Sequence, residues 1–233
     1  MRKLLLVAAE AMEFAGLRRH CRPDARLGWP LRFAREVELN GLRMILVAHG
    51  AGPALAGEAC DVAWSRGEAD AVVSTGFCGA LDPALGAGEV FVATSVAAPG
   101  EPAIDARIPD CARPCATGRL LSADRVIQTA KEKRSFGSLG ASAVEMEAAA
   151  VGARAVRWGV PFYCIRGVTD LAQEDFRIDF NALRCGDGRL GKARIAWAAL
   201  RRPVTGIPEV FRLYQRSRVA ANSIGDFLAD CRF

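Results

Sequence analysis

Short apolar runs of strand length alternate with helix-like stretches along most of this sequence. The runs Lys3–Ala9, Ala71–Ser74, Glu89–Ala97 and Val160–Val168 are rich in Val, Leu, Ile and Ala. Continuous apolar runs of this length are typical of strands that are buried on both faces of a sheet. Because stretches with helical spacing lie between them, we expect an α/β protein, a three-layer single domain with a central mixed sheet.

The remaining segments fit the same plan. Asn40-Gly41 between two apolar runs is a strong signal for a β-hairpin. The other predicted elements are the hairpin strands Val37–Leu39 and Met44–Ala48, helices at Met12–His20, Ala54–Gly67 and Ser142–Gly159, a short strand at Leu120-Leu121 and a loop at Ala97–Pro114.

The positive charge is concentrated near the C-terminus. The net charge is +5, but residues 184–233 hold ten Lys/Arg and four Asp/Glu, a local charge of +6, which leaves −1 for the rest. Helical spacing of apolar residues predicts a basic helical extension, residues 203–233, packed on a domain of residues 1–202. A solvated helical face is one interpretation of this charge, and a surface for peripheral contact with an anionic membrane is the other.

Composition bears on where the protein is located and on which ligands it binds. No apolar run approaches the ~20 residues that span a bilayer, and the run after Arg2-Lys3 meets Glu10 and Glu13 at once, which favours a buried strand over a signal peptide. We expect a cytoplasmic protein, with peripheral contact at the inner membrane as an option. The eight cysteines are scattered and only two histidines occur, so we predict reduced thiols, no metal site and no nucleic-acid partner.

A glycine-containing stretch, Ser74-Thr75-Gly76-Phe77-Cys78-Gly79, follows the strand that begins at Ala71. Glycines there allow a tight turn and close approach of a ligand to backbone N–H groups. In open α/β sheets ligands bind beyond the carboxyl ends of strands, where this turn is expected. The other glycine turn, residues 50–53, lacks the third glycine of a dinucleotide-binding motif, which argues against a nicotinamide-dependent oxidoreductase.

Two further acids follow predicted strands. Asp170 ends the run that contains Arg166, where a carboxylate can reach a ligand, although a helix N-cap is the interpretation that spacing alone favours. Glu13 follows the first strand, where an acid in the first turn of a helix is the simpler account.

The stretch Glu145-Met146-Glu147 holds two acids directly before an alanine-rich run. If it is extended, both carboxylates lie on one side and Met146 on the other. If it is helical, the two side chains diverge by about 200° and share no site. Two acids that simply favour a helix N-terminus are the alternative.

Together these motifs resemble the nucleoside phosphorylase and nucleosidase superfamily, and most closely the nucleosidases that cleave methylthioadenosine and adenosylhomocysteine. The glycine stretch resembles the family's Thr-Gly-x-x-Gly-x-Leu segment, residues 144–147 its Val-Glu-Met-Glu motif, and residues 160–170 its Val-Pro-Phe strand that ends in Asp. The three motifs occur in the family's order over about residues 3 to 200.

The resemblance implies a role for each matching residue. Asp170 would protonate the leaving purine, Glu147 would bind the ribose hydroxyls with Met146 against the sugar, and Glu13 would position the attacking water. Glu145 and Arg166 would support the site, and residues Thr75, Gly76, Phe77, Cys78 and Gly79 would line it. Val126 stands where the family carries an aromatic residue that stacks on the base. A homodimer without a cofactor is implied as well.

We therefore predict cleavage of the N-ribosidic bond of a 5′-substituted adenosine. No Gly-Asp-Pro phosphate turn occurs near residues 8–12, which favours hydrolysis over phosphate-dependent phosphorolysis, with phosphate as co-substrate in the second case. A nucleoside-binding protein without turnover is the third alternative. The segments 187–189, 198–203 and 207–213 resemble the C-terminus of the hopanoid-associated phosphorylase branch, which implies a 5′ substituent that is a lipid.

Overall fold

The computed structural model describes residues 2–183, 192–201 and 203–233. Its strands form one sheet: β1 (Lys3–Ala8), β2 (Asp24–Arg26), β3 (Phe33–Leu39), β4 (Leu42–Ala48), β5 (Ala71–Ala80), β6 (Val90–Ala97), β7 (Ile104–Asp105), β8 (Ala116–Ser122), β9 (Ala143–Glu145) and β10 (Phe162–Asp170). The helices are α1 (Ala15–Arg18), preceded by a 3-10 turn at Ala11–Phe14, then α2 (Pro53–Ser65), α3 (Ala130–Gly137), α4 (Ala148–Trp158), α5 (Lys192–Arg201) and α6 (Gly206–Asp230).

The sheet is mixed, as predicted, and β5 is its central strand. β5 pairs with β1 and β10 in parallel and with β9 in the antiparallel sense, so strands β5, β10, β6, β8 and β9 close into a ring while β1, β4, β3 and β2 extend from it. The carboxyl ends of β5 and β10 therefore meet beside β9, which places three sequence motifs at one edge.

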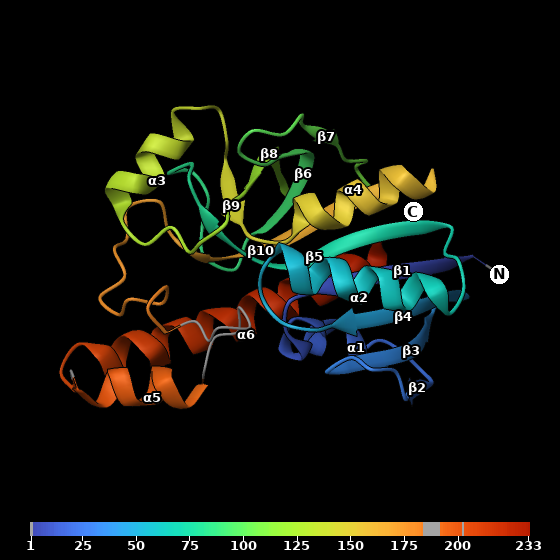
Figure 1. The fold of residues 1–233 in the computed structure, drawn as a ribbon, viewed down its shortest axis with the longest axis horizontal. Coiled ribbons are helices and arrows are strands. Elements are labelled where there is room, and N and C mark those ends of the chain that lie inside the picture. Colours follow the sequence, from blue (N-terminus) through green and yellow to red (C-terminus); the bar gives the residue numbers. More distant parts are fainter. Residues whose placement is uncertain (1, 184–191, 202) are drawn as a thin grey trace.

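Helices cover both faces of the sheet (Figure 1). Alternate residues of β1 show why: Leu5 and Val7 belong to one core cluster with residues of α2 and α4, and Leu4 and Leu6 belong to the other with residues of α1 and α6. This period-2 division of an entirely apolar strand produces the predicted three layers.

The second half of α6 belongs to the core. Its buried side chains include Ile224, Phe227 and Leu228, and Arg232 forms a β-bridge with Asp110. The first half lies beside α5 and projects from the rest of the molecule as a helical hairpin, at the lower left of Figure 1. The predicted division of the chain after residue 202 stays a prediction, and no helix of the described residues is long and apolar enough to cross a membrane.

Several predicted elements are corrected. The helix expected from Ser142 begins at Ala148, because residues 143–145 pair with β5 and β8. The helix expected at residues 12–20 is a 3-10 turn and one short α-helical turn. The predicted glycine turn at residues 74–79 is part of β5, since pairing with β10 continues to Gly79.

Three other differences are smaller. The predicted loop at residues 97–114 contains β7, which pairs with β6. The expected two-residue strand at Leu120 is the seven-residue β8, and β2 extends the predicted hairpin, whose turn residue Asn40 has a positive φ of 52°.

The crossing of α1 and α6 allows no side chain between the two helices. A Cβ added to Gly225 would lie 2.2 Å from backbone atoms of Gly16 and Leu17. We expect Gly225→Ala to destabilise the fold by about 1–3 kcal/mol because the helices must separate. Thermal unfolding measures this, with Gly28→Ala as the control, since no atom lies within 4 Å of an added Cβ there. Equal unfolding temperatures of the two variants would contradict the close crossing.

Candidate active site

One cavity of about 230 Å³ collects most of the predicted site residues. It is lined by three strand ends, from β5, β9 and β10, and by the segment before α3. The predicted residues in its lining are Phe77, Cys78, Gly79, Val126, Glu145, Met146, Glu147 and Asp170. Four other predicted residues are not in this lining: Glu13, Thr75, Gly76 and Arg166. Glu13 contacts Phe77 and Arg166 contacts Glu145, and both of these contacted residues line the cavity.

Arg166 and Glu145 form a buried ion pair behind the cavity. The Nη2 atom of Arg166 lies 2.6 Å from Glu145 Oε2 and donates to the Ser74 hydroxyl at the same distance. Both charged side chains are almost fully buried, at 1% and 2% exposure. The pair therefore joins β10, β9 and β5 at the floor of the cavity, where it holds the strand ends in position.

Glu145 also sets where α4 begins. Its carboxylate accepts hydrogen bonds from the backbone N–H groups of Glu147 and Ala148, at 2.9 Å for Oε2. These N–H groups have no partner within the helix, and a carboxylate is favoured at the positive end of a helix. Residues 143–145 are thus extended and Met146 and Glu147 form a bend, so the stretch is not helical but the strand stops short of the Met146 that the ribose-binding prediction requires to be extended. The helix starts only after the second acid.

Glu147 points to a different partner. Its Oε1 accepts the backbone N–H of Gly52 at 2.6 Å, at the N-terminus of α2. Burial, together with the nearby charge of Glu145, raises the pKa of Glu147 to about 8. A carboxyl in this state gains from any positive charge that appears in the cavity.

Glu13 lies against the backbone of β5. Its Oε1 accepts the Phe77 N–H at 2.9 Å, and its Oε2 accepts the Glu10 N–H at 2.8 Å. Gly76 has a φ of 134°, and a Cβ there would lie 2.5 Å from Glu13 Oε1, so glycine is required for this approach. Burial raises the pKa of the Glu13 carboxyl. Glu13 therefore fulfils the turn role that the simpler account predicted and also reaches the strand that lines the cavity.

Asp170 ends β10 and caps no helix, which corrects the N-cap interpretation. Its Oδ2 lies 2.5 Å from the ammonium of Lys133, and its Oδ1 lies 3.0 Å from the Thr169 hydroxyl. Burial raises the pKa of Asp170, although the hydrogen bond and charge of Lys133 oppose this. The carboxyl is 7% exposed and lies at the cavity wall.

Sequence reasoning missed five residues at this site: Lys133, which contacts Asp170, and Arg125, Ile127, Val144 and Thr169, which line the cavity. Lys133 stands in the charged run Lys131-Glu132-Lys133-Arg134, which is typical of an exposed helix. Nothing in that run distinguishes the buried lysine from its neighbours. The helix itself was not predicted, although Thr129-x-x-Glu132 is a capping motif that can mark its start.

The predicted base-contacting residue, Val126, is held by Asn181. The Asn181 amide accepts the Val126 N–H and donates to the Val126 carbonyl, both at 2.9 Å. Val126 therefore presents an aliphatic side chain in the cavity lining.

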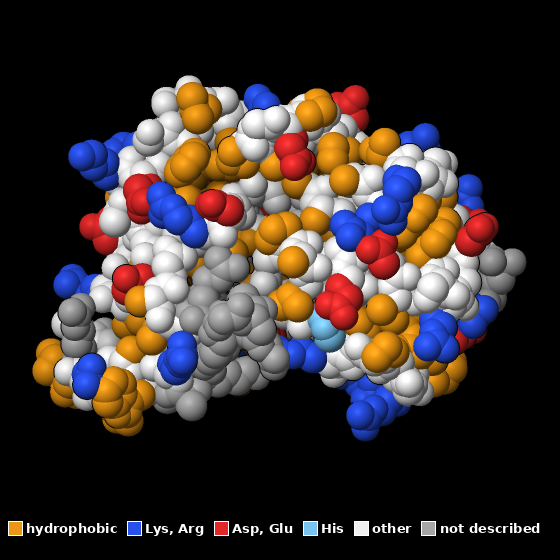
Figure 2. All heavy atoms as spheres, viewed as in Figure 1, with side chains coloured by type: hydrophobic (Ala, Val, Ile, Leu, Met, Phe, Trp, Pro, Cys, Tyr) orange, Lys and Arg blue, Asp and Glu red, His pale blue; other side chains and the backbone are white. Residues whose placement is uncertain are grey.

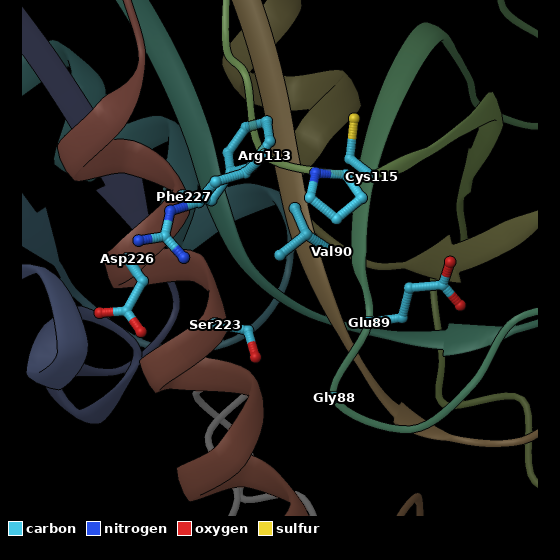
Figure 3. Close-up of a pocket in the computed structure, with 9 residues that line it drawn as sticks. Gly88, Glu89, Val90, Arg113, Cys115, Ser223, Asp226 and Phe227 are labelled. Atoms are coloured by element: carbon cyan, nitrogen blue, oxygen red, sulfur yellow. The ribbon is translucent and has the colours of Figure 1, made fainter.

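A second hollow, of about 380 Å³, lies between α6, residues 113–115 and the start of β6 (Figure 3). Its charged side chains already have partners: Arg113 pairs with Asp230, and Asp226 with His20. It holds none of the predicted site residues. Among the described residues no group of three His, Cys, Asp or Glu side chains is arranged to hold a metal ion.

Comparison with known proteins gives the family. The model of the phosphorylase superfamily matches residues 5–184, which include every predicted site residue. The chain belongs to the phosphorylase superfamily. The predicted membership of this enzyme superfamily is thereby confirmed.

Individual relatives agree with this assignment. A 5′-methylthioadenosine/S-adenosylhomocysteine nucleosidase from Staphylococcus saprophyticus is 27% identical over 186 residues, 68% of this chain and 79% of that protein. A nucleosidase of the same name from Neisseria meningitidis, solved with methylthio-immucillin-A, superposes with a TM-score of 0.72 at 22% identity and covers 99% of this chain and 98% of its own. The nucleosidase from S. pneumoniae, solved with a transition-state inhibitor, superposes with a TM-score of 0.72 at 17% sequence identity. The match covers 98% of this chain and 99% of that one. At these identities the solved structures confirm the predicted fold.

The raised pKa of Glu147 yields a stability prediction for this superfamily member. A carboxyl whose pKa rises on folding, here from 4.5 to about 8, costs the folded state stability as the pH rises through that window. Glu147→Gln removes the ionisation, so its melting temperature relative to wild type should increase between pH 5 and pH 9. Glu101→Gln, at an exposed carboxyl, is the control. A Glu147→Gln difference that is constant with pH would contradict the assignment.

Proposed function

We propose that this protein cleaves the N-ribosidic bond of a 5′-substituted adenosine by hydrolysis and releases adenine. The observation that carries the proposal is the convergence of two carboxyls, the buried Asp170 and the partly buried Glu147, on one cavity with Glu13 behind its wall. The relative from Staphylococcus saprophyticus, named for this type of reaction, supports it.

The chemistry matches the charges of the site. As the bond to the base breaks, positive charge develops on the ribose and negative charge on the purine. Asp170 acts as the general acid on the purine, and burial, which raises its pKa, favours the protonated form that such an acid needs. Glu147 binds the ribose hydroxyls, and the developing cation favours its ionised form, so its interaction is stronger in the transition state than with the substrate.

Water, rather than phosphate, is the proposed nucleophile. The Gly52 N–H, a donor at the start of α2 that could face an anion, is already bonded to Glu147. Arg166 is paired with Glu145, and Lys133 with Asp170. Arg125, the cation in the cavity lining, is paired with Glu132. Glu147 in the lining and Glu13 behind it are acids, which favours a neutral nucleophile over a phosphate anion. Glu13 positions or deprotonates the water.

Adenine release tests this function. Wild type should release adenine and free ribose product from methylthioadenosine or adenosylhomocysteine at equal rates with and without phosphate. Asp170→Asn should lose about 10²–10⁴-fold in kcat because it removes a general acid. Asp82→Asn, at an exposed carboxylate outside the cavity, should keep the wild-type rate.

Other outcomes separate the alternatives. A phosphorylated ribose product formed only with phosphate would establish phosphorolysis. Tight nucleoside binding without release would identify a binding protein. An unchanged rate in Asp170→Asn would overturn the role of that residue.

The 5′ substituent is proposed to be a lipid, as the similarity of the tail to the hopanoid-associated branch implies. The part of that similarity at residues 187–189 lies outside the described residues. The exposed half of the α5–α6 hairpin supports the proposal independently, since it carries large apolar side chains that are 45–86% exposed: Trp197, Leu200, Val204, Ile207, Phe211 and Tyr214. Figure 2 shows apolar side chains gathered at this end of the molecule, beside basic ones.

The charge of the same hairpin suits an anionic membrane. Arg201 stacks on the Trp197 ring at 3.4 Å, and Arg212 and Arg218 are exposed. The acid in this part of the hairpin, Glu209, is buried and accepts the backbone N–H groups of Arg177 and Ile178. Aromatic and aliphatic side chains beside arginines are typical of helices that lie in the interface of an anionic bilayer. We propose peripheral membrane contact through this hairpin.

Vesicle co-sedimentation tests the contact with the full-length chain, because part of α6 belongs to the core. Wild type should bind phosphatidylglycerol vesicles and dissociate from them at high salt. It should not bind vesicles of neutral phosphatidylcholine. Trp197→Ser combined with Phe211→Ser should lose the binding. Leu139→Ser combined with Val156→Ser, at exposed apolar residues elsewhere, is the matched control. No binding by wild type, or a change of oligomeric mass in the hairpin variant, would overturn the membrane assignment.

The homodimer and the cytoplasmic location stay predictions. Light scattering coupled to size exclusion measures the mass directly, and a monomer at micromolar concentration would contradict the dimer.

A further inference from the structure

Lys133 is a buried cation that the proposed reaction has not yet used. Its side chain is 0% exposed, and its ammonium lies 2.5 Å from Asp170 Oδ2 and donates to the carbonyl of Leu171 at 2.7 Å. The ring of Phe176 lies 5.2 Å from the same nitrogen. Enclosing an ammonium completely is costly unless it is paired, so this arrangement requires the Asp170 carboxylate.

The helix that carries Lys133 is fixed to the segment that follows Asp170. The N–H of Ala130, at the start of α3, donates to Asp175 at 2.6 Å, and the N–H of Phe176 donates to the Gln128 carbonyl at 2.8 Å. A capping box between Thr129 and Glu132 closes the first turn of the helix. The ammonium therefore has one well-defined position against Asp170.

Other groups around Asp170 do not replace this cation. Cys78 of β5 and Thr169 of β10 are uncharged neighbours, and Thr169 donates to Oδ1. Glu174, in the segment after β10, is an acid whose charge opposes ionisation of Asp170 and which is itself paired with Arg216 of α6. Within the part of the chain that the structure describes, Lys133 is the cation in contact with the Asp170 carboxyl.

This pairing raises a question about the general acid. An acid can protonate the purine only if it holds a proton, but the ammonium of Lys133, 2.5 Å from Oδ2, favours the ionised form of Asp170 against the effect of burial. The pair as a whole still holds one transferable proton.

We propose that Lys133 supplies, through Asp170, the proton that the departing purine receives. As the bond between C1′ and the purine N9 breaks, its electron pair goes to the purine, which takes a proton from Asp170. Asp170 takes one from Lys133, whose N–H bond electrons stay on nitrogen as the amine lone pair. The attacking water gives its hydroxyl to C1′ and its proton to solvent. After the products leave, solvent in the cavity returns a proton to Asp170, which passes it to the buried Lys133. Lys133 is thus a positioning residue that acts through Asp170, and its role rests on the proposed function.

The direction in which the alkaline limb of the pH profile of kcat moves distinguishes this role from a structural one. A carboxyl loses its proton at lower pH than an ammonium does. If Lys133 holds the transferable proton, Lys133→Met leaves Asp170 as the sole holder, and the alkaline limb of kcat should move down by about one pH unit or more. If Lys133 merely stabilised the carboxylate, its loss would raise the pKa of Asp170 and the limb would move up.

The experiment measures adenine release from methylthioadenosine between pH 5 and pH 10. Lys131→Met, at an exposed lysine of the same helix, is the matched control and should keep the wild-type profile. Lys133→Arg restores a cation whose guanidinium does not give up its proton, so it should not restore kcat at alkaline pH. If thermal unfolding shows that Lys133→Met is not folded, Lys133→Gln is measured in its place.

The possible results separate two failures. Release by wild type and its loss in Asp170→Asn establish the reaction. An unchanged or upward-shifted limb in the Lys133 variant, or full rescue by arginine, then overturns the role of Lys133 alone. No adenine release by wild type overturns both the function and this role.

Discussion

The ion pair between Arg166 and Glu145 holds the site together. It joins the middle of β10 to the last residue of β9, and the Ser74 hydroxyl ties it to β5. The second function of Glu145, to cap α4, means that the same carboxylate decides where the helix starts. A buried charge pair tolerates the loss of neither partner, because the remaining charge would stay without compensation. The strand register, the helix start and the cavity floor therefore depend on one contact.

The other acids at the cavity divide into two groups. Asp170 is paired with Lys133, whereas within the described residues Glu13 and Glu147 accept hydrogen bonds from backbone N–H groups alone. The carboxyls of Glu13 and Glu147 have raised pKa values because burial disfavours their charge. A fold gains nothing from such groups when the cavity is empty, but a ribosyl cation would stabilise them in their ionised form. This is the physical reason to interpret the cavity as a site for charge development rather than for simple binding.

Much of the fold was predictable because strand and helix signals in this chain are local. The apolar runs of β1, β6 and β10 and the Asn40-Gly41 turn identified their elements directly. The boundary at Ala148 was not predictable, since the helical spacing begins at residue 142 and only the pairing of residues 143–145 with β5 and β8 keeps those residues extended. Lys133 was missed for a related reason: it is a lysine in a charged run, and its burial depends on where α3 is placed.

For the C-terminal helices α5 and α6, too, local sequence predicted the elements but not their burial. Its helical character and positive charge could be read from residue spacing and composition, but nothing local distinguishes Phe211, which is exposed, from Phe227, which is in the core. The sequence by itself determined the alternation of strands and helices, the family motifs and the identity of the acids, because these are properties of neighbouring residues. The tertiary structure alone decided which acids are paired, which lysine is buried and which half of α6 meets solvent. Those outcomes depend on contacts between residues far apart in the chain, and burial and charge act only once such residues have been brought together.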